Sequence, residues 1–395
     1  MKLLLYSHYF APSIGGVETI VMLLARGLAE LQAADGSREF ELIVVTQTQR
    51  ENFEENGLPF RVVRQPGLRK LAGLVRSADV VHVAGPALAP LVLGLLARKP
   101  VVVEHHGFQV ICPTGQMFIE SRGEPCPGHF IAGRRTECWN CDPSLSWLGS
   151  RKLWLLTFVR RFLSKRIAAN IMPTNWLGEQ LRLPRATTIH HGLVQIQPPR
   201  KSERQELHAQ VIAFQGRLVT TKGARVLLEA ARILCEREQD FRLVIIGDGP
   251  EKANLEALTA RAPLAGRVRF TGKLVPAALE LELAQACVVV VPSLGGEVFG
   301  LVVAENMQRG IPVIASDLGS LAEVLGDTGV TFRTGDAPEL ARKISALLQS
   351  PEKLKAMERL QNERAAKEFT VSKMVDDHRI VYRKLLGENS QSTLN

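Results

Sequence analysis

The stretch Glu297-Val298-Phe299-Gly300-Leu301-Val302-Val303-Ala304-Glu305 joins a predicted strand to a predicted helix. The run before it, Cys287-Val288-Val289-Val290-Val291-Pro292-Ser293, is apolar without a break, as in a buried parallel strand. From Phe299 the apolar residues recur at helical spacing as far as Arg309. Glu297 therefore follows a strand's carboxyl end, where open α/β sheets bind ligands, and Gly300 opens a helix N-terminus that can meet an anion. Two solvated glutamates are the alternative, but the apolar flanks and nearby glycines favour a site.

Strands and helices alternate along both halves of the chain of 395 residues, which predicts doubly wound parallel sheets. The first half runs from the strand 2–6 to a charged linker at Pro198-Pro199, and the second half restarts with the strand 211–214. We predict an N-terminal domain, a C-terminal domain, a last helix that crosses back to the first domain, and a disordered tail. Their predicted boundaries are 1–195, 196–370, 371–387 and 388–395.

Four local patterns resemble the retaining glycosyltransferases of family 4, the glycogen-synthase-like enzymes with the GT-B fold. They are the E-x7-E stretch followed by Gly310-Ile311-Pro312-Val313-Ile314-Ala315-Ser316, Gly15-Gly16-Val17-Glu18, Gly216-Arg217-Leu218 with Lys222-Gly223, and the run from His106 to Cys112-Pro113. The resemblance covers most of the chain. It implies an α/β fold of two Rossmann-like, doubly wound domains that face each other across a cleft. It also implies that the N-terminal domain is acceptor-binding and that the C-terminal domain is nucleotide-sugar-binding.

Arg217 and Lys222 flank a turn at a strand end, and a diphosphate needs such paired cations. Solvated loop cations are the alternative. The resemblance assigns the donor phosphates to these two residues, the ribose to Glu305 and the sugar hydroxyls to Glu297. It also implies a donor-binding role for Gly15, Gly16, Phe299, Gly300 and Leu301.

Two adjacent histidines, His105 and His106, follow the predicted strand 100–104. A single histidine is usually structural, but two at a strand end favour a site. The resemblance places His106 near the reacting centre, so we predict His106 and Glu297 as catalytic residues. Gly107 stands where the family pattern has an aspartate.

The segment 107–145 interrupts the alternation and contains Cys112, Cys126, Cys138 and Cys141. The last two form C-x-x-C, which is compatible with one structural zinc held by four thiolates. Free thiols packed in a loop are the alternative, and the long first spacing favours it.

Residues 147–167 hold six basic residues and no acidic residue. Trp154, Phe158 and Phe162 form one stripe at helical spacing, interleaved with Arg151, Arg161 and Lys165, while Leu153, Leu156, Leu163 and Ile167 share another face. The stripe fits either an anionic membrane surface or the protein core. Residues 1–195 contain 22 Lys and Arg against 15 Asp and Glu, so most of the +9 net charge lies in this half.

We therefore expect a glycosyltransferase that moves a sugar from a UDP- or GDP-sugar to a glycan or lipid-linked acceptor in cell-surface polysaccharide or glycolipid synthesis. No D-x-D motif occurs, so we expect no cofactor to be required for catalysis. No nucleic-acid motif is present, and we expect a cytoplasmic protein that can lie on the inner face of a membrane. A nucleotide-sugar 2-epimerase and a non-catalytic partner subunit with the same fold are the alternatives.

Overall fold

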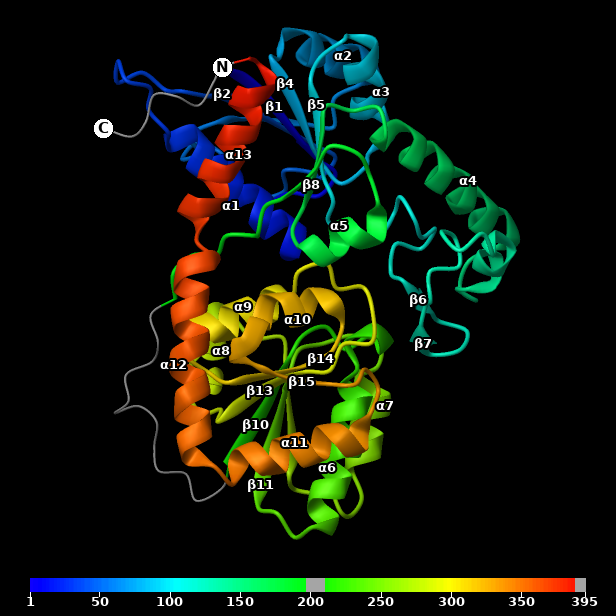
Figure 1. Cartoon of the computed structure of the whole chain (residues 1–395), viewed down its shortest axis with the longest axis vertical. Coiled ribbons are helices and arrows are strands. Elements are labelled where there is room, and N and C mark those ends of the chain that lie inside the picture. The colour runs from blue at the N-terminus through cyan, green and yellow to red at the C-terminus, as the bar shows by residue number, and fades with distance from the viewer. Residues whose placement is uncertain (197–209, 388–395) are drawn as a thin grey trace. The chain divides into compact units, whose positions relative to one another are not determined.

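The computed structural model describes residues 1–196 and 210–387, which form two compact units (Figure 1). Unit 1 comprises Met1–Gln116, Gly128–Val194 and the chain from Glu368 on, and unit 2 comprises Met117–Pro127 and Gln195–Lys367. The predicted linker at Pro198-Pro199 and the predicted tail 388–395 lie outside the described residues. No helix in the described ranges has the length and hydropathy needed to cross a bilayer.

The described part of unit 1 contains a seven-stranded parallel sheet in the order β3-β2-β1-β4-β5-β8-β9. Its strands are β1 (Lys2–Ser7), β2 (Glu41–Thr46), β3 (Arg61–Arg64), β4 (Val80–Ala84), β5 (Val101–Glu104), β8 (Ala169–Met172) and β9 (Ala186–Thr188). Its helices are α1 (Gly16–Glu30), α2 (Leu68–Ser77), α3 (Leu88–Leu96), α4 (Trp147–Ser164), α5 (Asn175–Leu181) and α13 (Val371–Leu385).

Among its described residues, unit 2 contains a six-stranded parallel sheet in the order β12-β11-β10-β13-β14-β15. Its strands are β10 (Gln210–Gln215), β11 (Phe241–Ile246), β12 (Val268–Gly272), β13 (Val288–Val291), β14 (Val313–Ser316) and β15 (Val330–Phe332). Its helices are α6 (Ala224–Glu236), α7 (Lys252–Thr259), α8 (Pro276–Leu283), α9 (Leu301–Gln308), α10 (Gly319–Leu325), α11 (Ala337–Leu348) and α12 (Pro351–Glu368).

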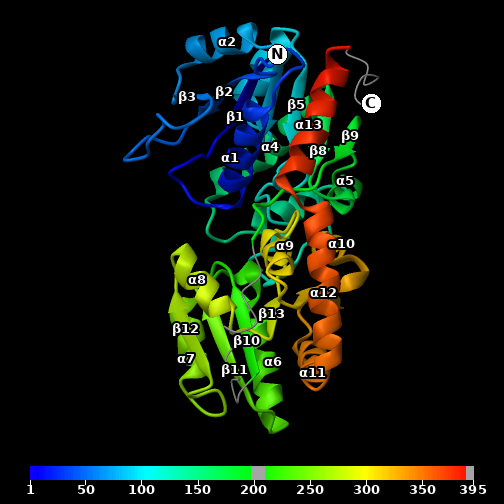
Figure 2. The same cartoon turned by 90° about the vertical axis from the view of Figure 1, so that its left-hand side faces the viewer.

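The central strands of both sheets are buried along their whole length, which explains their continuous apolar sequences. In unit 2, α6 and α11 bury their apolar faces in one core with β10, β11 and β13. Figure 2 shows the helices of this unit along its sheet. The predicted doubly wound α/β architecture is therefore confirmed.

The last helix, α13, packs in unit 1 beside α1, as both views show (Figures 1 and 2). Glu39 binds Arg379 at 2.7 Å and Arg383 at 2.9 Å, and it is almost fully buried. Gly27 of α1 allows the two helices to approach, since a Cβ atom there would lie 2.4 Å from Val375 Cγ2. A glycine at this position of α1 therefore leaves room for the Val375 side chain of α13.

The segment 117–127 differs from the prediction, which placed all of 107–145 in the first domain. It forms a short antiparallel hairpin of β6 (Phe118–Ile119) and β7 (Glu124–Pro125), and its contacts group it with unit 2. Two-residue strands leave too little periodicity to be recognised in the sequence. Helix α12 was not predicted either, because its polar sequence has only a weak apolar face.

We expect Gly27→Ala to lower the free energy of unfolding by about 1–3 kcal/mol, because the added methyl group overlaps the stiff Val375 side chain. Gly73→Ala on α2 is the matched control, since no atom lies within 4 Å of its Cβ position. That change should stabilise the protein by about 0.5–1 kcal/mol through helix propensity. Urea unfolding measures both values, and equal stabilisation by the two changes would contradict the close contact of α1 and α13.

Candidate functional site

The site in unit 2 lies where the strand order reverses, between β10 and β13. The loops after these two strands leave the same edge of the sheet in different directions, which opens space at the carboxyl ends. The loop after β10 carries Arg217 and Lys222, and the loop after β13 carries Glu297. The two loops touch through the Leu294 N–H, which donates to the Thr221 carbonyl at 2.7 Å.

Lys222 and Glu297 form an ion pair across this point, with 2.5 Å between Nζ and Oε1. The same Glu297 oxygen accepts a hydrogen bond from Ser293 Oγ at 2.8 Å, and the Glu297 carbonyl accepts one from Ser320 Oγ at 2.9 Å. Ser293 is itself fixed, because its carbonyl accepts from Ser316 Oγ at 2.7 Å. Three neighbouring elements therefore hold Glu297 in one position.

Gly300 gives α9 its start. Its φ of +97° lies in the left-handed region, and a Cβ atom there would lie 2.4 Å from Leu321 Cδ2. The preceding Phe299 is buried, and Leu301 is the first helical residue. The backbone is thus bare where the helix begins, and free N–H groups at such an N-terminus favour an anion.

Glu305 lies one helical turn further along and faces Arg309, whose Nη1 is 3.8 Å from the carboxylate. Burial raises the pKa of Glu305, and the Arg309 charge opposes this effect. Arg309 is buried and also binds Glu280 at 2.7 Å, so it is held by two carboxylates. Arg217, by contrast, is exposed.

In unit 1 the loop after β1 carries Gly15 and Gly16, directly before α1. Glu18 folds back over this loop, where Ser13 Oγ donates to its carboxylate at 3.0 Å. A Cβ atom at Gly15 would lie 2.5 Å from the Glu18 carboxylate, so this position requires a glycine as long as Glu18 stays folded back.

His106 lies beside Glu104, the last residue of β5, with 3.6 Å between Nε2 and Oε2. The Glu104 carboxylate is fully buried, and His82, His191 and His378 also approach it. Burial would raise the pKa of Glu104, but His106 and the other imidazoles lower it well below its usual range. Sequence reasoning noticed only the two adjacent histidines. The sequence did offer a signal for Glu104, since it is the one ionisable residue of an otherwise apolar strand.

His105 points away from this group, and its Nε2 lies 2.9 Å from Asn170 Oδ1. Burial lowers the pKa of His105 to about 4 and that of His191 to about 3, so both rings are neutral at pH 7. The structure therefore separates the two adjacent histidines into one that packs in the sheet and one, His106, that adjoins the carboxylate.

Of the four cysteines of the 107–145 segment, Cys112, Cys138 and Cys141 are buried and Cys126 is half-buried. Among the described residues, neither set of three or more side chains close enough to hold one metal ion includes a cysteine. Cys126 belongs to the hairpin in unit 2, whereas Cys112, Cys138 and Cys141 belong to unit 1. The predicted tetrathiolate zinc site stays a prediction without geometric support.

The aromatic stripe on α4 is only partly as predicted. Trp154 packs against Trp139, with ring centroids 6.1 Å apart, and Phe158 packs against Phe130 at 4.7 Å. The 107–145 segment thus covers two of the three rings. The exposed face of α4 is rotated relative to the prediction. It carries the row Leu148, Lys152, Leu155, Val159 and Phe162, and the exposed Arg166 follows in the turn after the helix.

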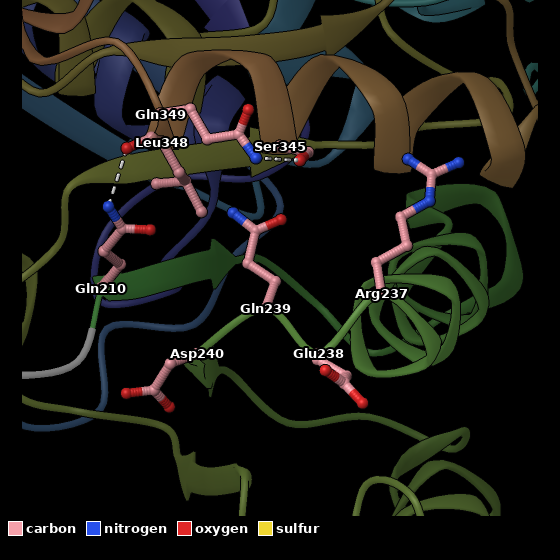
Figure 3. Close-up of a pocket in the computed structure, with 8 residues that line it drawn as sticks. All are labelled: Gln210, Arg237, Glu238, Gln239, Asp240, Ser345, Leu348 and Gln349. Carbon is pink, nitrogen blue, oxygen red and sulfur yellow. Dashed lines mark hydrogen bonds between the residues drawn. The ribbon is translucent and has the colours of Figure 1, made fainter.

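Unit 2 contains two pockets among its described residues. One of about 660 Å³ is lined by the hairpin at Gly123, by Gly223 and by Thr334, among others. The other, of about 500 Å³, is shown in Figure 3, where Gln210 donates to the Leu348 carbonyl at 2.7 Å. Gln210 begins β10, so this second pocket lies at the amino ends of the strands, opposite the edge that carries Lys222.

Solved structures of glycosyltransferases share this fold, and they confirm the predicted GT-B class. Alr3699/HepE from Anabaena, in complex with UDP, superposes with a TM-score of 0.73 at 19% identity and covers 97% of this chain and 100% of its own. Sucrose-phosphate synthase from Thermosynechococcus elongatus gives a TM-score of 0.73 at 20% identity and covers 98% of this chain and 100% of its own.

Residues 196–364 match the family described as "Glycosyl transferases group 1". A 2-deoxystreptamine glucosyltransferase of Streptomyces kanamyceticus is 33% identical over 180 residues, 45% of this chain and 46% of that protein. A phosphatidyl-myo-inositol mannosyltransferase of Mycobacterium leprae is 38% identical over 132 residues, 33% of this chain and 34% of that protein. The matched part of the chain spans less than half the length of these curated relatives.

Proposed function

We propose that this protein is a retaining glycosyltransferase that transfers a sugar from a UDP- or GDP-sugar to a glycan or lipid-linked acceptor. The observation that carries the proposal is the cluster of Lys222, Glu297 and the α9 N-terminus at the switch point of the unit 2 sheet. The match of residues 196–364 to group 1 glycosyltransferases supports it. So does the UDP in the Anabaena structure of the same fold.

Arg217, Lys222 and the N–H groups at the start of α9 bind the diphosphate of the donor. As the glycosidic bond to the diphosphate breaks, negative charge grows on the leaving oxygen, and these fixed positive groups stabilise it. Glu305 accepts hydrogen bonds from the ribose, and Glu297 accepts them from the sugar. The Lys222–Glu297 pair orients both side chains before the donor arrives.

His106 lies near the reacting carbon in this proposal, and Gly15 and Gly16 let the backbone approach the donor. His106 suits a position near a charged transition state, because its ring is nearly buried and adjoins the Glu104 carboxylate. Glu104 acts here as a positioning residue for the imidazole.

The experiment that tests the function is a donor screen by thermal shift with UDP-, GDP- and ADP-sugars, followed by transfer assays with the donor that stabilises the protein. We expect Arg217→Ala and Lys222→Ala each to lower kcat/KM by tenfold to a thousandfold, about 1.4–4 kcal/mol. Lys355→Ala is the matched control, because Lys355 is an exposed lysine on α12. Unchanged kinetics in both site variants would exclude this diphosphate site.

Glu297 and Glu305 should separate by ligand in isothermal titration calorimetry. Glu305→Gln should weaken binding of the free nucleoside diphosphate and of the nucleotide sugar alike, because the ribose is common to both. Glu297→Gln should weaken binding of the nucleotide sugar by roughly tenfold, because it removes a charged acceptor for the sugar hydroxyls. It should not weaken binding of the free nucleoside diphosphate, because Lys222 then has no carboxylate partner and can meet the phosphates. Equal losses for both ligands in both variants would contradict these roles.

We further propose that α4 lies on an anionic membrane and brings the enzyme to a lipid-linked acceptor. Leu148 is 71% exposed, Leu155 59% and Phe162 54%, although all three are apolar. Lys152 and Arg166 lie on the same face, and the Arg166 guanidinium stacks on the Phe162 ring. An apolar row flanked by cations, on a helix without acidic residues, complements an anionic interface.

Charge reversal should release the protein from vesicles of phosphatidylcholine and phosphatidylglycerol. We expect Lys152→Glu with Arg166→Glu to lower the bound fraction in flotation at least tenfold, since each cation near the surface contributes about 1 kcal/mol. Lys353→Glu with Lys355→Glu on α12 is the matched control and should float like the wild type. Arg151 and Arg161 are unsuitable for this test, because Arg151 stacks on Trp139 and Arg161 donates to the Leu181 carbonyl. A wild type that does not float would refute the membrane surface.

A further inference from the structure

A second group of side chains in unit 1 shares Glu104 with the proposed transfer site but adds two residues, His82 and His378, that have no role in that reaction. Glu104 ends β5, His82 lies in β4 and His378 lies in α13, and all three side chains are fully buried. His82 Nε2 is 3.3 Å from Glu104 Oε2, and His378 Nε2 is 3.7 Å from the same oxygen. The ligating atoms of the three side chains all lie within 4.8 Å of one another.

The hydrogen bonds around the two histidines direct both Nε2 atoms toward the carboxylate. His378 Nδ1 is 2.7 Å from the Met374 carbonyl, which can only accept, so Nδ1 carries a proton. The neutral ring then presents the Nε2 lone pair to a carboxylate. His82 Nδ1 lies 2.8 Å from the Tyr382 hydroxyl, which can donate or accept, so this contact fixes the orientation of the ring and leaves its tautomer open.

The four polar atoms at the centre of this group are buried beside one another. His82 Nε2, His378 Nε2 and both Glu104 oxygens form no hydrogen bond with any described residue, although they are buried. Buried polar atoms almost always have a partner, and a lone pair that faces a carboxylate is repulsive. A cation between them would satisfy all three groups.

The distances favour a metal ion over a shared proton. A charged hydrogen bond between imidazole and carboxylate closes to about 2.7–2.9 Å, which is shorter than either separation here. Zinc binds nitrogen and carboxylate oxygen at about 2.0–2.2 Å, which places tetrahedral ligand atoms about 3.3–3.6 Å apart. The observed 3.3 Å lies within that range, and the observed 3.7 Å lies just above it.

We propose that His82 Nε2, His378 Nε2 and Glu104 Oε2 bind one structural zinc ion that fastens α13 to β4 and β5. Met374 and Tyr382 hold the second nitrogen of each ring, as partners of metal-bound histidines commonly do. Three protein ligands leave the fourth tetrahedral position to a water molecule.

Glu104, His106 and His191 form another set of suitable size, but their geometry is less favourable. The His106 and His191 rings stack with centroids 5.2 Å apart and 24° between their planes. Nearly parallel rings do not direct their nitrogen lone pairs at one point. This leaves His106 available to the substrate in the proposed reaction.

The test is elemental analysis and zinc X-ray absorption on the full chain, purified with a tag that contains no histidine from zinc-supplemented cells. We expect about one zinc per chain, with a nitrogen and oxygen shell near 2.0 Å and no sulfur shell near 2.3 Å. A metal-free protein would overturn the proposal and leave a proton on His378 as the cation. A sulfur shell would overturn it in favour of the cysteines.

Variants identify the ligands. His378→Ala and Glu104→Gln should each lower the zinc content per chain at least tenfold. His191→Ala is the matched control, because His191 is also a buried histidine beside this carboxylate, and it should keep the wild-type zinc content. If a ligand variant does not fold, stripping the wild type with dipicolinate in dilute urea replaces it: Tm should fall and should recover with zinc but not with magnesium. Zinc retained in His378→Ala, or no change in Tm on stripping, would refute the site.

Discussion

The contact between the loops that follow β10 and β13 is the constraint on which unit 2 depends. Gly223 has a φ of +68°, and a Cβ atom there would lie only 1.9 Å from the Pro292 carbonyl oxygen. The two loops therefore meet backbone to backbone, and the Leu294 N–H closes the contact at Thr221. Lys222 immediately precedes this glycine, so the contact between the loops also places its ammonium group beside the Glu297 carboxylate. The position of both charged groups therefore depends on the close approach at Gly223.

Unit 1 has the corresponding constraint in the buried charge of Glu104. An isolated carboxylate in a protein interior is strongly unfavourable, so the chain must supply compensating groups from several elements. It does so from β4, from the turn after β5, from the segment before Leu193 and from α13, which the Glu39 ion pairs also hold in place. The docking of the last helix and the position of His106 therefore depend on the same carboxylate.

Sequence reasoning succeeded where the information is local. The strands are short apolar runs, so the fold was predictable. Glu297, Gly300 and Lys222 lie in loops that follow two of these strands, so their placement at one edge of the unit 2 sheet was predictable as well. The Glu104 group was not, because its members come together only in the tertiary fold: Tyr382 and His82 are 300 positions apart. The α4 helix shows the same limit. Its helical periodicity was recognised in the sequence. Trp139 and Phe130 cover one of its faces, and which face they cover depends on how the irregular segment 107–145 folds.

The Lys222–Glu297 pair is partly exposed to solvent, whereas the group of Glu104, His82 and His378 is fully buried. The first can therefore bind a ligand, and the second acts on stability. The Lys222 side chain is 25% exposed and that of Glu297 is 12% exposed, so water or a ligand can reach the pair. An anion that displaces the carboxylate from Lys222 exchanges one charged partner for another, which keeps the net change in free energy small. Glu104, His82 and His378 are 0% exposed, and no exchange of partners with solvent is open to them. Whatever lies between these three side chains must be enclosed when α13 docks, and it therefore acts on the stability of unit 1.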